Sequence, residues 1–135
     1  MTNKEFNESF RNRTKKFAVA IIKFIEKIPF NSATRTLTYQ LGKSGTSLAS
    51  NFRAFCLARS RNERFAKICI VVEETDESVF WLIMFDETGY GDKNELKYLL
   101  TEGMEILKVT NKIKQRLYPA MKQTEVSTRG SDFLN

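Results

Sequence analysis

The apolar residues of this chain recur every three or four positions along most of its length, and this period constrains the fold more than any other feature. In the first segment their spacings are 4, 7, 4, 3 and 4, which mark one face of an α-helix. These residues are Phe6, Phe10, Phe17, Ile21, Phe24 and Ile28. The 135 residues include only six glycines and two prolines. So few breakers argue against a sandwich or a barrel, and the chain is predicted to be all-α.

Helix-breaking and helix-capping residues between the apolar stripes divide the chain into four predicted helices. They are predicted over about residues 4–28, 33–58, 61–88 and 93–118. Pro29 ends the first, because the residue before a proline is pushed out of the helical region, and Pro119 closes the last. Ser32 or Thr34 is expected to cap the second helix, and Ser60 begins the third.

The connections between these helices are short, which favours antiparallel neighbours. The sequence therefore predicts an up-down-up-down antiparallel four-helix bundle over residues 1–122, with residues 123–135 as a flexible tail. Gly42 and Gly45 fall inside the second predicted helix. Each costs up to about 1 kcal/mol relative to alanine, so both predict a close approach of another helix.

Several classes of protein are disfavoured by what the chain lacks. It contains no histidine, so histidine-based acid–base catalysis and histidine metal sites are excluded. Cys56 and Cys69 are too few for a disulfide framework and are expected to be small core residues. The opening residues are polar, and no apolar run approaches the roughly 20 residues that span a bilayer. The chain is expected to be cytoplasmic, with no membrane contact, metal or cofactor.

Polar residues at helical spacing form a second stripe on two of the predicted helices. They are Gln40, Ser44, Ser47 and Asn51, and on the next helix Glu74, Ser78 and Trp81. We interpret them as a structural network of hydrogen bonds between the two helices. The alternatives are a catalytic site using Glu74, Asp76 or Glu77, and an all-carboxylate magnesium site. Gly42-Lys43-Ser44 ends like a phosphate-binding loop, but Leu37 stands where that motif needs glycine. The chain is predicted not to be an enzyme.

Charge is distributed unevenly along the chain, whose net charge is +6. Residues 1–64 carry 13 Lys and Arg against four Asp and Glu, a net +9, and residues 65–135 carry nine against twelve, a net −3. A further basic run occupies residues 108–116. Such clusters form either an ordinary solvated surface or a footprint for the phosphates of nucleic acid. The candidate nucleic-acid-binding residues are Arg11, Arg13, Lys15, Lys16, Arg53, Arg59, Arg61 and Arg64.

Two separated segments of the chain resemble a known family. Residues 39–51 read YQLGKSGTSLASN, and residues 74–82 read ETDESVFWL. They resemble the second- and third-helix signatures of the four-helix bundle proteins encoded in 23S rRNA intervening sequences of bacteria. The resemblance covers about residues 17–117. It departs at Ala54, where the family usually has Glu, and at Glu73, where it usually has Lys.

The resemblance implies a four-helix bundle that assembles as a homopentamer. A more distantly similar protein is the accessory subunit of diversity-generating retroelements, a basic pentameric bundle that binds nucleic acid and partners a reverse transcriptase. By this analogy we expect an oligomeric accessory protein that binds RNA or DNA, with a reverse transcriptase as one kind of partner. The alternative is a self-assembling module that binds only protein, through apolar residues outside the stripes such as Phe30, Phe55, Phe80 and Tyr98.

Overall fold

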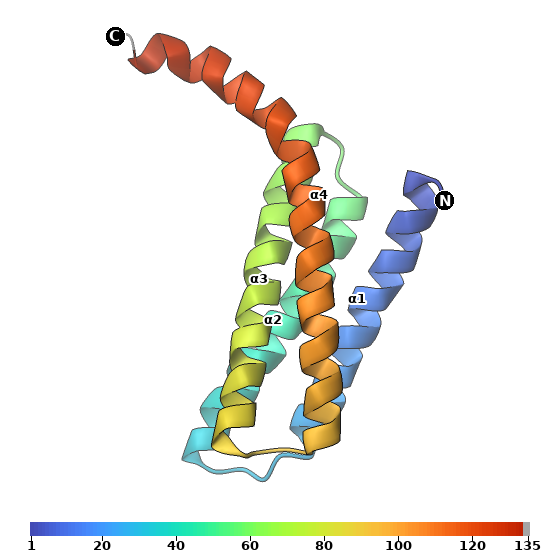
Figure 1. The fold of residues 1–135 in the computed structure, drawn as a ribbon, viewed down its shortest axis with the longest axis vertical. Helices are drawn as coiled ribbons and strands as arrows, with labels where there is room; N and C mark the ends of the chain where they lie inside the picture. The colour runs from blue at the N-terminus through green and yellow to red at the C-terminus, as the bar shows by residue number, and fades with distance from the viewer. Residues whose placement is uncertain (134–135) are drawn as a thin grey trace.

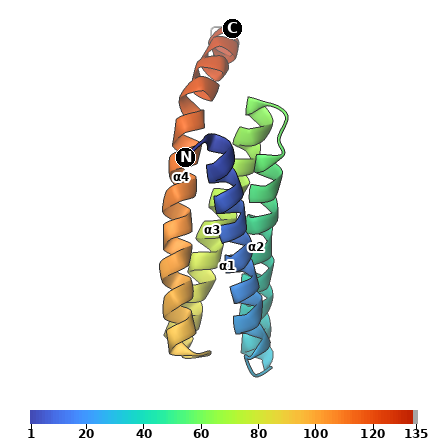
Figure 2. The ribbon, with the colours of Figure 1, turned by 90° about the vertical axis from the view of Figure 1, so that its right-hand side faces the viewer.

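The computed structural model describes the backbone of residues 1–133 and the side chains of residues 1–118. It contains four helices that pack in chain order, α1 on α2, α2 on α3, α3 on α4, with α4 returning to α1. The helices are α1 (Asn3–Glu26), α2 (Ser32–Cys56), α3 (Arg61–Thr88) and α4 (Lys93–Phe133). Figures 1 and 2 show them running alternately up and down. The predicted up-down-up-down bundle is therefore confirmed.

Short polar residues and a glycine mark the ends of the helices, where they satisfy the free backbone groups or allow the chain to turn. Asn31 caps α2, because its side chain accepts hydrogen bonds from the backbone N–H of Ala33 and Thr34 at 2.9 Å. The cap thus lies one residue before Ser32, the first position that the sequence suggested. Ser60 caps α3 as predicted, accepting from the Glu63 N–H at 3.0 Å. Gly89 ends α3 at φ +79°, a left-handed conformation that favours glycine.

The predicted end of the fourth helix at residue 118 is corrected by the structure. The backbone of α4 continues through Pro119 to Phe133, and residues 134–135 lie outside the described residues. A proline removes one backbone hydrogen bond and crowds the preceding turn, so it bends a helix without always ending it. Figure 1 shows the last, red part of α4 bending away from the other helices. The flexibility expected for residues 123–135 stays a prediction.

Phenylalanine dominates the core that holds the four helices together. The largest buried side chains include Phe17 and Phe24 from α1, Phe52 from α2 and Phe85 from α3, each at most 1% exposed. The rings of Phe24 and Phe85 meet edge to face between α1 and α3, with their centroids 5.2 Å apart at an interplanar angle of 78°. Phe55, suggested above as an outward-facing residue, is instead buried in this core because it stacks on Phe52.

The two glycines of α2 lie where α1 approaches most closely. A Cβ added at Gly45 would stand 2.6 Å from Cδ1 of the buried Ile21, and one at Gly42 would stand 3.1 Å from Cδ1 of Ile25. The close helix contact predicted from these residues is therefore confirmed. The absence of a side chain at these two positions lets the α1 and α2 backbones come close together.

Candidate nucleic-acid interface

Three arginines surround the turn between α2 and α3. Arg59 lies in the turn, and Arg61 and Arg64 lie in the first turn of α3, all with exposed side chains. The Ser60 cap fixes the start of α3, so these residues leave the backbone in a defined direction. Glu63 is held in the same turn, with its carboxylate 3.4 Å from the Arg59 backbone N–H. The turn thus presents three cations and one carboxylate.

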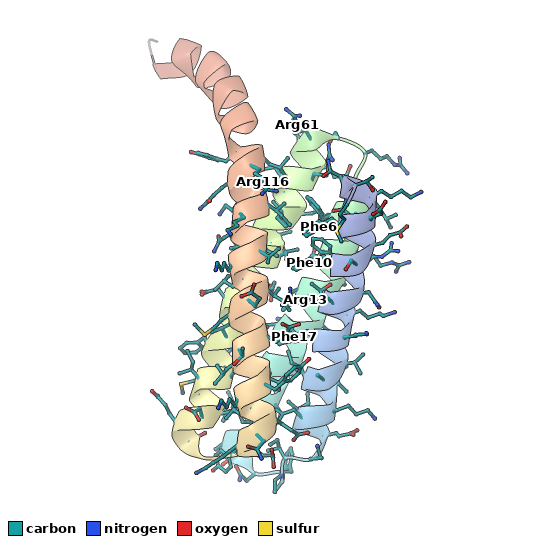
Figure 3. The ribbon with its side chains drawn as sticks, turned by 45° about the vertical axis from the view of Figure 1, so that its right-hand side comes forward. Phe6, Phe10, Arg13, Phe17, Arg61 and Arg116 are labelled. Atoms are coloured by element: carbon teal, nitrogen blue, oxygen red, sulfur yellow. The ribbon has the colours of Figure 1, made fainter. Side chains whose placement is uncertain are left out.

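The last bundle-packed turns of α4 bring a second set of cations to the same end of the molecule. Because α3 and α4 are antiparallel, Tyr118 meets Phe65 with ring centroids 6.1 Å apart. One turn further along, Lys114 lies near enough to Cys69 to act on its thiol electrostatically. Figure 3 shows Arg61 and Arg116 at this shared end.

We call this surface the basic end. Its members are Arg59, Arg61, Arg64, Lys67, Lys108, Lys112, Lys114 and Arg116. Residues 59–72 and 106–118, which contain them, carry these eight cations and a single acid, Glu63. The four members from α4 were not among the residues predicted to bind nucleic acid. The spacing of charges within one helix does not show which other helix packs beside it. The antiparallel pairing of the third and fourth predicted helices is the signal that identifies them.

Three of the remaining candidates lie along α1 and α2. Arg11 and Lys15 from α1, and Arg53 from α2, line an open groove of about 760 Å³ between the outer surfaces of these helices. Lys16 is exposed on α1 and does not line this groove. Three candidates therefore lie at the basic end and three in the α1–α2 groove, whereas Lys16 belongs to neither surface.

Arg13 has a structural role that the sequence did not predict. Its guanidinium donates two hydrogen bonds to the Glu102 carboxylate of α4, from Nε at 2.9 Å and from Nη2 at 2.7 Å. This side-by-side geometry is the strong form of an arginine–carboxylate pair. Arg13 is thus committed to joining α1 to α4, and we remove it from the candidates for binding phosphate.

The predicted polar network is centred on two serines. Ser78 of α3 donates to Oγ of Ser44 in α2 at 2.9 Å, and both side chains are buried. The Ser44 hydroxyl also reaches the Leu41 carbonyl of its own helix, at 3.3 Å. Two buried hydroxyls that pair with each other fix the register of α2 against α3 without leaving an unsatisfied group.

The other predicted members of the network are half-buried, and those with hydrogen bonds make them locally. Asn51 donates from Nδ2 to the Ser47 carbonyl at 2.9 Å and to Ser47 Oγ at 3.1 Å, both within α2. Gln40, Glu74 and Trp81 make no hydrogen bond across α2 and α3 among the described side chains. Among the described side chains, cross-helix hydrogen bonding between these predicted members is therefore limited to the serine pair.

Glu74 is the carboxylate most affected by its surroundings. Partial burial, followed by the negative charge of Glu77, raises the pKa of Glu74 above its ordinary range, and Lys43 opposes this effect. Within residues 1–118, no three Cys, Asp or Glu side chains gather closely enough to hold a metal ion. Burial likewise raises the pKa of Cys56 and of Cys69, so each thiol is kept in its less nucleophilic, protonated form.

None of the helices, over the described residues, contains a stretch long and apolar enough to cross a lipid bilayer. Every buried side-chain nitrogen or oxygen in the described part of the chain has a hydrogen-bond partner.

Comparison with known proteins places the chain in a family. The sequence profile of the 23S rRNA-intervening sequence protein matches residues 8–112. No curated protein matches the chain. A solved structure of a protein of unknown function, from the S23 ribosomal protein family of Bacteroides thetaiotaomicron, is similar with a TM-score of 0.71. It is 23% identical, and the match covers 81% of this chain and 97% of that one, which shows the shared fold. The chain belongs to the 23S rRNA-intervening sequence protein family.

Proposed function

We propose that this protein is a non-enzymatic, oligomeric accessory factor that binds RNA or DNA through its basic end. The observation that carries this proposal is the concentration of eight Lys and Arg residues against one Glu in residues 59–72 and 106–118, two stretches that antiparallel packing of α3 and α4 brings together. Cations in such numbers attract the phosphate backbone and release its condensed counterions. The described part of the basic end contains no recognition helix of a known kind that would read bases in a groove. The protein therefore contacts the phosphate backbone of the nucleic acid, with little sequence preference.

The test is a titration of labelled RNA and DNA with the purified protein at about 50 and 200 mM salt, the range over which phosphate contacts lose affinity. The informative variant is Arg61, Lys112, Arg116→Ala, which removes three exposed cations from the basic end. We expect binding at low salt, strong weakening at high salt, and a large loss of affinity in the variant.

The matched control is Lys23, Arg35, Lys97→Ala. It also removes three exposed positive charges, but none belongs to the basic end. The control is expected to bind almost as the unaltered protein does. Absence of binding by the unaltered protein at low salt contradicts the proposal. Equal losses of affinity in the two variants would show that binding depends on net charge and not on the basic end.

Self-assembly forms the second part of the proposal. Val19 and Ile22 form an exposed apolar pair on α1, at 50% and 44% exposed, and Phe80 and Ile83 form another on α3, at 51% and 42%. Each pair lies one helical turn apart and faces away from the core. Large apolar side chains paired in this way support an interface between copies, and the family resemblance favours five copies.

Light scattering coupled to size-exclusion chromatography tests this assembly. We expect a mass of several times 15.7 kDa. Ile22→Lys combined with Phe80→Lys is expected to reduce the mass toward that of one chain, while Leu57→Ser, at an exposed apolar position at the end of α2, leaves it unchanged. A single-chain mass for the unaltered protein at tens of micromolar contradicts self-assembly. An assembled protein that binds no nucleic acid favours the alternative of a protein-only module.

A further inference from the structure

The groove between α1 and α2 is a cavity that lies outside the basic end. It encloses about 760 Å³ and is open to solvent. Four small residues leave its base shallow and unobstructed, namely Ala18, Thr46, Ala49 and Ser50. Among the side chains of residues 1–118, those that line it include no aromatic ring. The groove therefore has room for a chain-like ligand but provides no platform on which a base would stack.

Three cations stand on the walls of this groove. Arg11 and Lys15 lie four residues apart on α1, which separates their Cα atoms by about 6 Å along the helix axis, and Arg53 faces them from α2. Among the side chains of residues 1–118, none of the three takes part in an ion pair. Asn12 adds an amide on the α1 side. These groups are available to an anion without the loss of a contact within the protein.

A second, smaller cavity extends the groove toward the basic end. It has a volume of about 390 Å³, shares Glu8 and Arg11 with the larger one, and adds Lys4 and Cys56. Cys56 is the last residue of α2, just before the turn that carries Arg59. Figure 2 shows the start of α1 beside this end of α2. A line of cations thus leads from the basic end into the groove, with Glu8 as its one acid.

We infer that the groove holds the sugar–phosphate backbone of a single-stranded segment of nucleic acid that continues from the basic end. This inference rests on the proposed function and specifies the form of the ligand. Two packed helices have axes about 8–10 Å apart, so the groove between their outer surfaces admits one strand and not a duplex. With cations on the walls and no ring to stack on, the phosphates face inward and the bases point to solvent.

The test separates steric blocking from loss of charge. Ala49→Phe fills the groove without altering net charge, and Arg11, Lys15, Arg53→Gln keeps the groove open but neutral. The matched control for the first is Ala33→Phe, at an exposed position in the first turn of α2. Circular dichroism confirms that each variant folds. Affinities are measured for a labelled oligothymidine and for a blunt DNA duplex of equal phosphate number.

We expect Ala49→Phe and the neutral variant each to weaken oligothymidine binding by about tenfold, as expected for the loss of a few phosphate contacts. Duplex binding and the Ala33→Phe variant are expected to change little. If the unaltered protein binds neither probe, the proposed function fails. If it binds both but neither groove variant weakens oligothymidine more than duplex, the groove inference is wrong while the proposed function stands.

Discussion

Arg13 and Glu102 close the side of the bundle between α1 and α4. The carboxylate side chain is 18% exposed and the arginine side chain 37%, so solvent screens the pair only in part. We predict that Arg13→Ala and Glu102→Ala each destabilise the fold, and that a double-mutant cycle gives a coupling energy of about 1 kcal/mol, the upper end for a partly exposed pair. Chemical denaturation of the four proteins provides the measurement. Additive single effects would show that the pair contributes nothing of its own.

The raised pKa of Glu74 predicts a stability that depends on pH. A carboxyl whose pKa is higher in the folded state than in the unfolded state loses stabilisation as pH rises from the unfolded value through the folded one. Replacing it with a neutral side chain removes that loss. We therefore predict that Glu74→Gln raises the melting temperature at pH 7, and that the gain disappears below about pH 4, where a glutamate is protonated in both states.

A matched control for this prediction is Asp76→Asn, an exposed acid on the same helix. It is expected to change the melting temperature little at either pH. A gain for Glu74→Gln that persists unchanged in acid would show that the amide stabilises by another route. A loss at pH 7 would show that the attraction of Lys43 outweighs burial and the charge of Glu77.

At the scale of the helices, Gly42 and Gly45 provide a paired test of the α1–α2 contact. Alanine improves helix propensity by about 1 kcal/mol at either position. At Gly45 a Cβ would meet Ile21, which is fully buried, at 2.6 Å, whereas at Gly42 it would meet the half-buried Ile25 at 3.1 Å. We predict that Gly45→Ala destabilises the protein, because the core around Ile21 has no space to adjust.

Gly42→Ala is predicted to be neutral or mildly stabilising, since Ile25 has room to move toward solvent. Thermal unfolding of both variants measures the difference directly. Equal effects at the two positions would contradict the interpretation that α1 approaches α2 most closely at Gly45.

The elements themselves were largely predictable from local signals. The apolar stripes identified all four helices, and Ser60 identified the start of α3. The end predicted at Pro119 was wrong, because the loss of one backbone hydrogen bond bends a long helix without ending it. The structure ends α2 at Cys56, two residues before the predicted end at residue 58. Helix ends depend on the geometry of the cap, which the apolar stripe does not reveal.

The candidate site was less predictable, because it depends on contacts between elements. Arg11, Lys15 and Arg53 could be named from charge alone, but their shared groove follows from the small residues and from the α1–α2 packing. Arg13 has the same charge and lies in the same run, yet it faces α4. Residues 108–116 joined the basic end only through the pairing of Phe65 with Tyr118.

At the scale of the whole molecule, the fold separates positive from negative charge along the bundle. The basic end collects eight cations, whereas residues 73–95, which form the rest of α3 and the turn into α4, carry eight acids and one lysine. Such a distribution orients a polyanion toward one end of the bundle and away from the other. In an oligomer the basic ends repeat with the symmetry, so weak contacts at each copy add up to avidity.

The salt dependence of binding is the most direct test that the basic end binds phosphates. The logarithm of the binding constant for a single strand falls with the logarithm of salt concentration, by a slope of about 0.7 for each phosphate neutralised. We predict that Arg61, Lys112, Arg116→Ala makes this slope shallower by about 2 for each bound protomer, corresponding to three lost phosphate contacts. Lys23, Arg35, Lys97→Ala is predicted to leave the slope unchanged. An unchanged slope in the basic-end variant, or an equal change in both, would contradict the assignment of the basic end as the phosphate-binding surface.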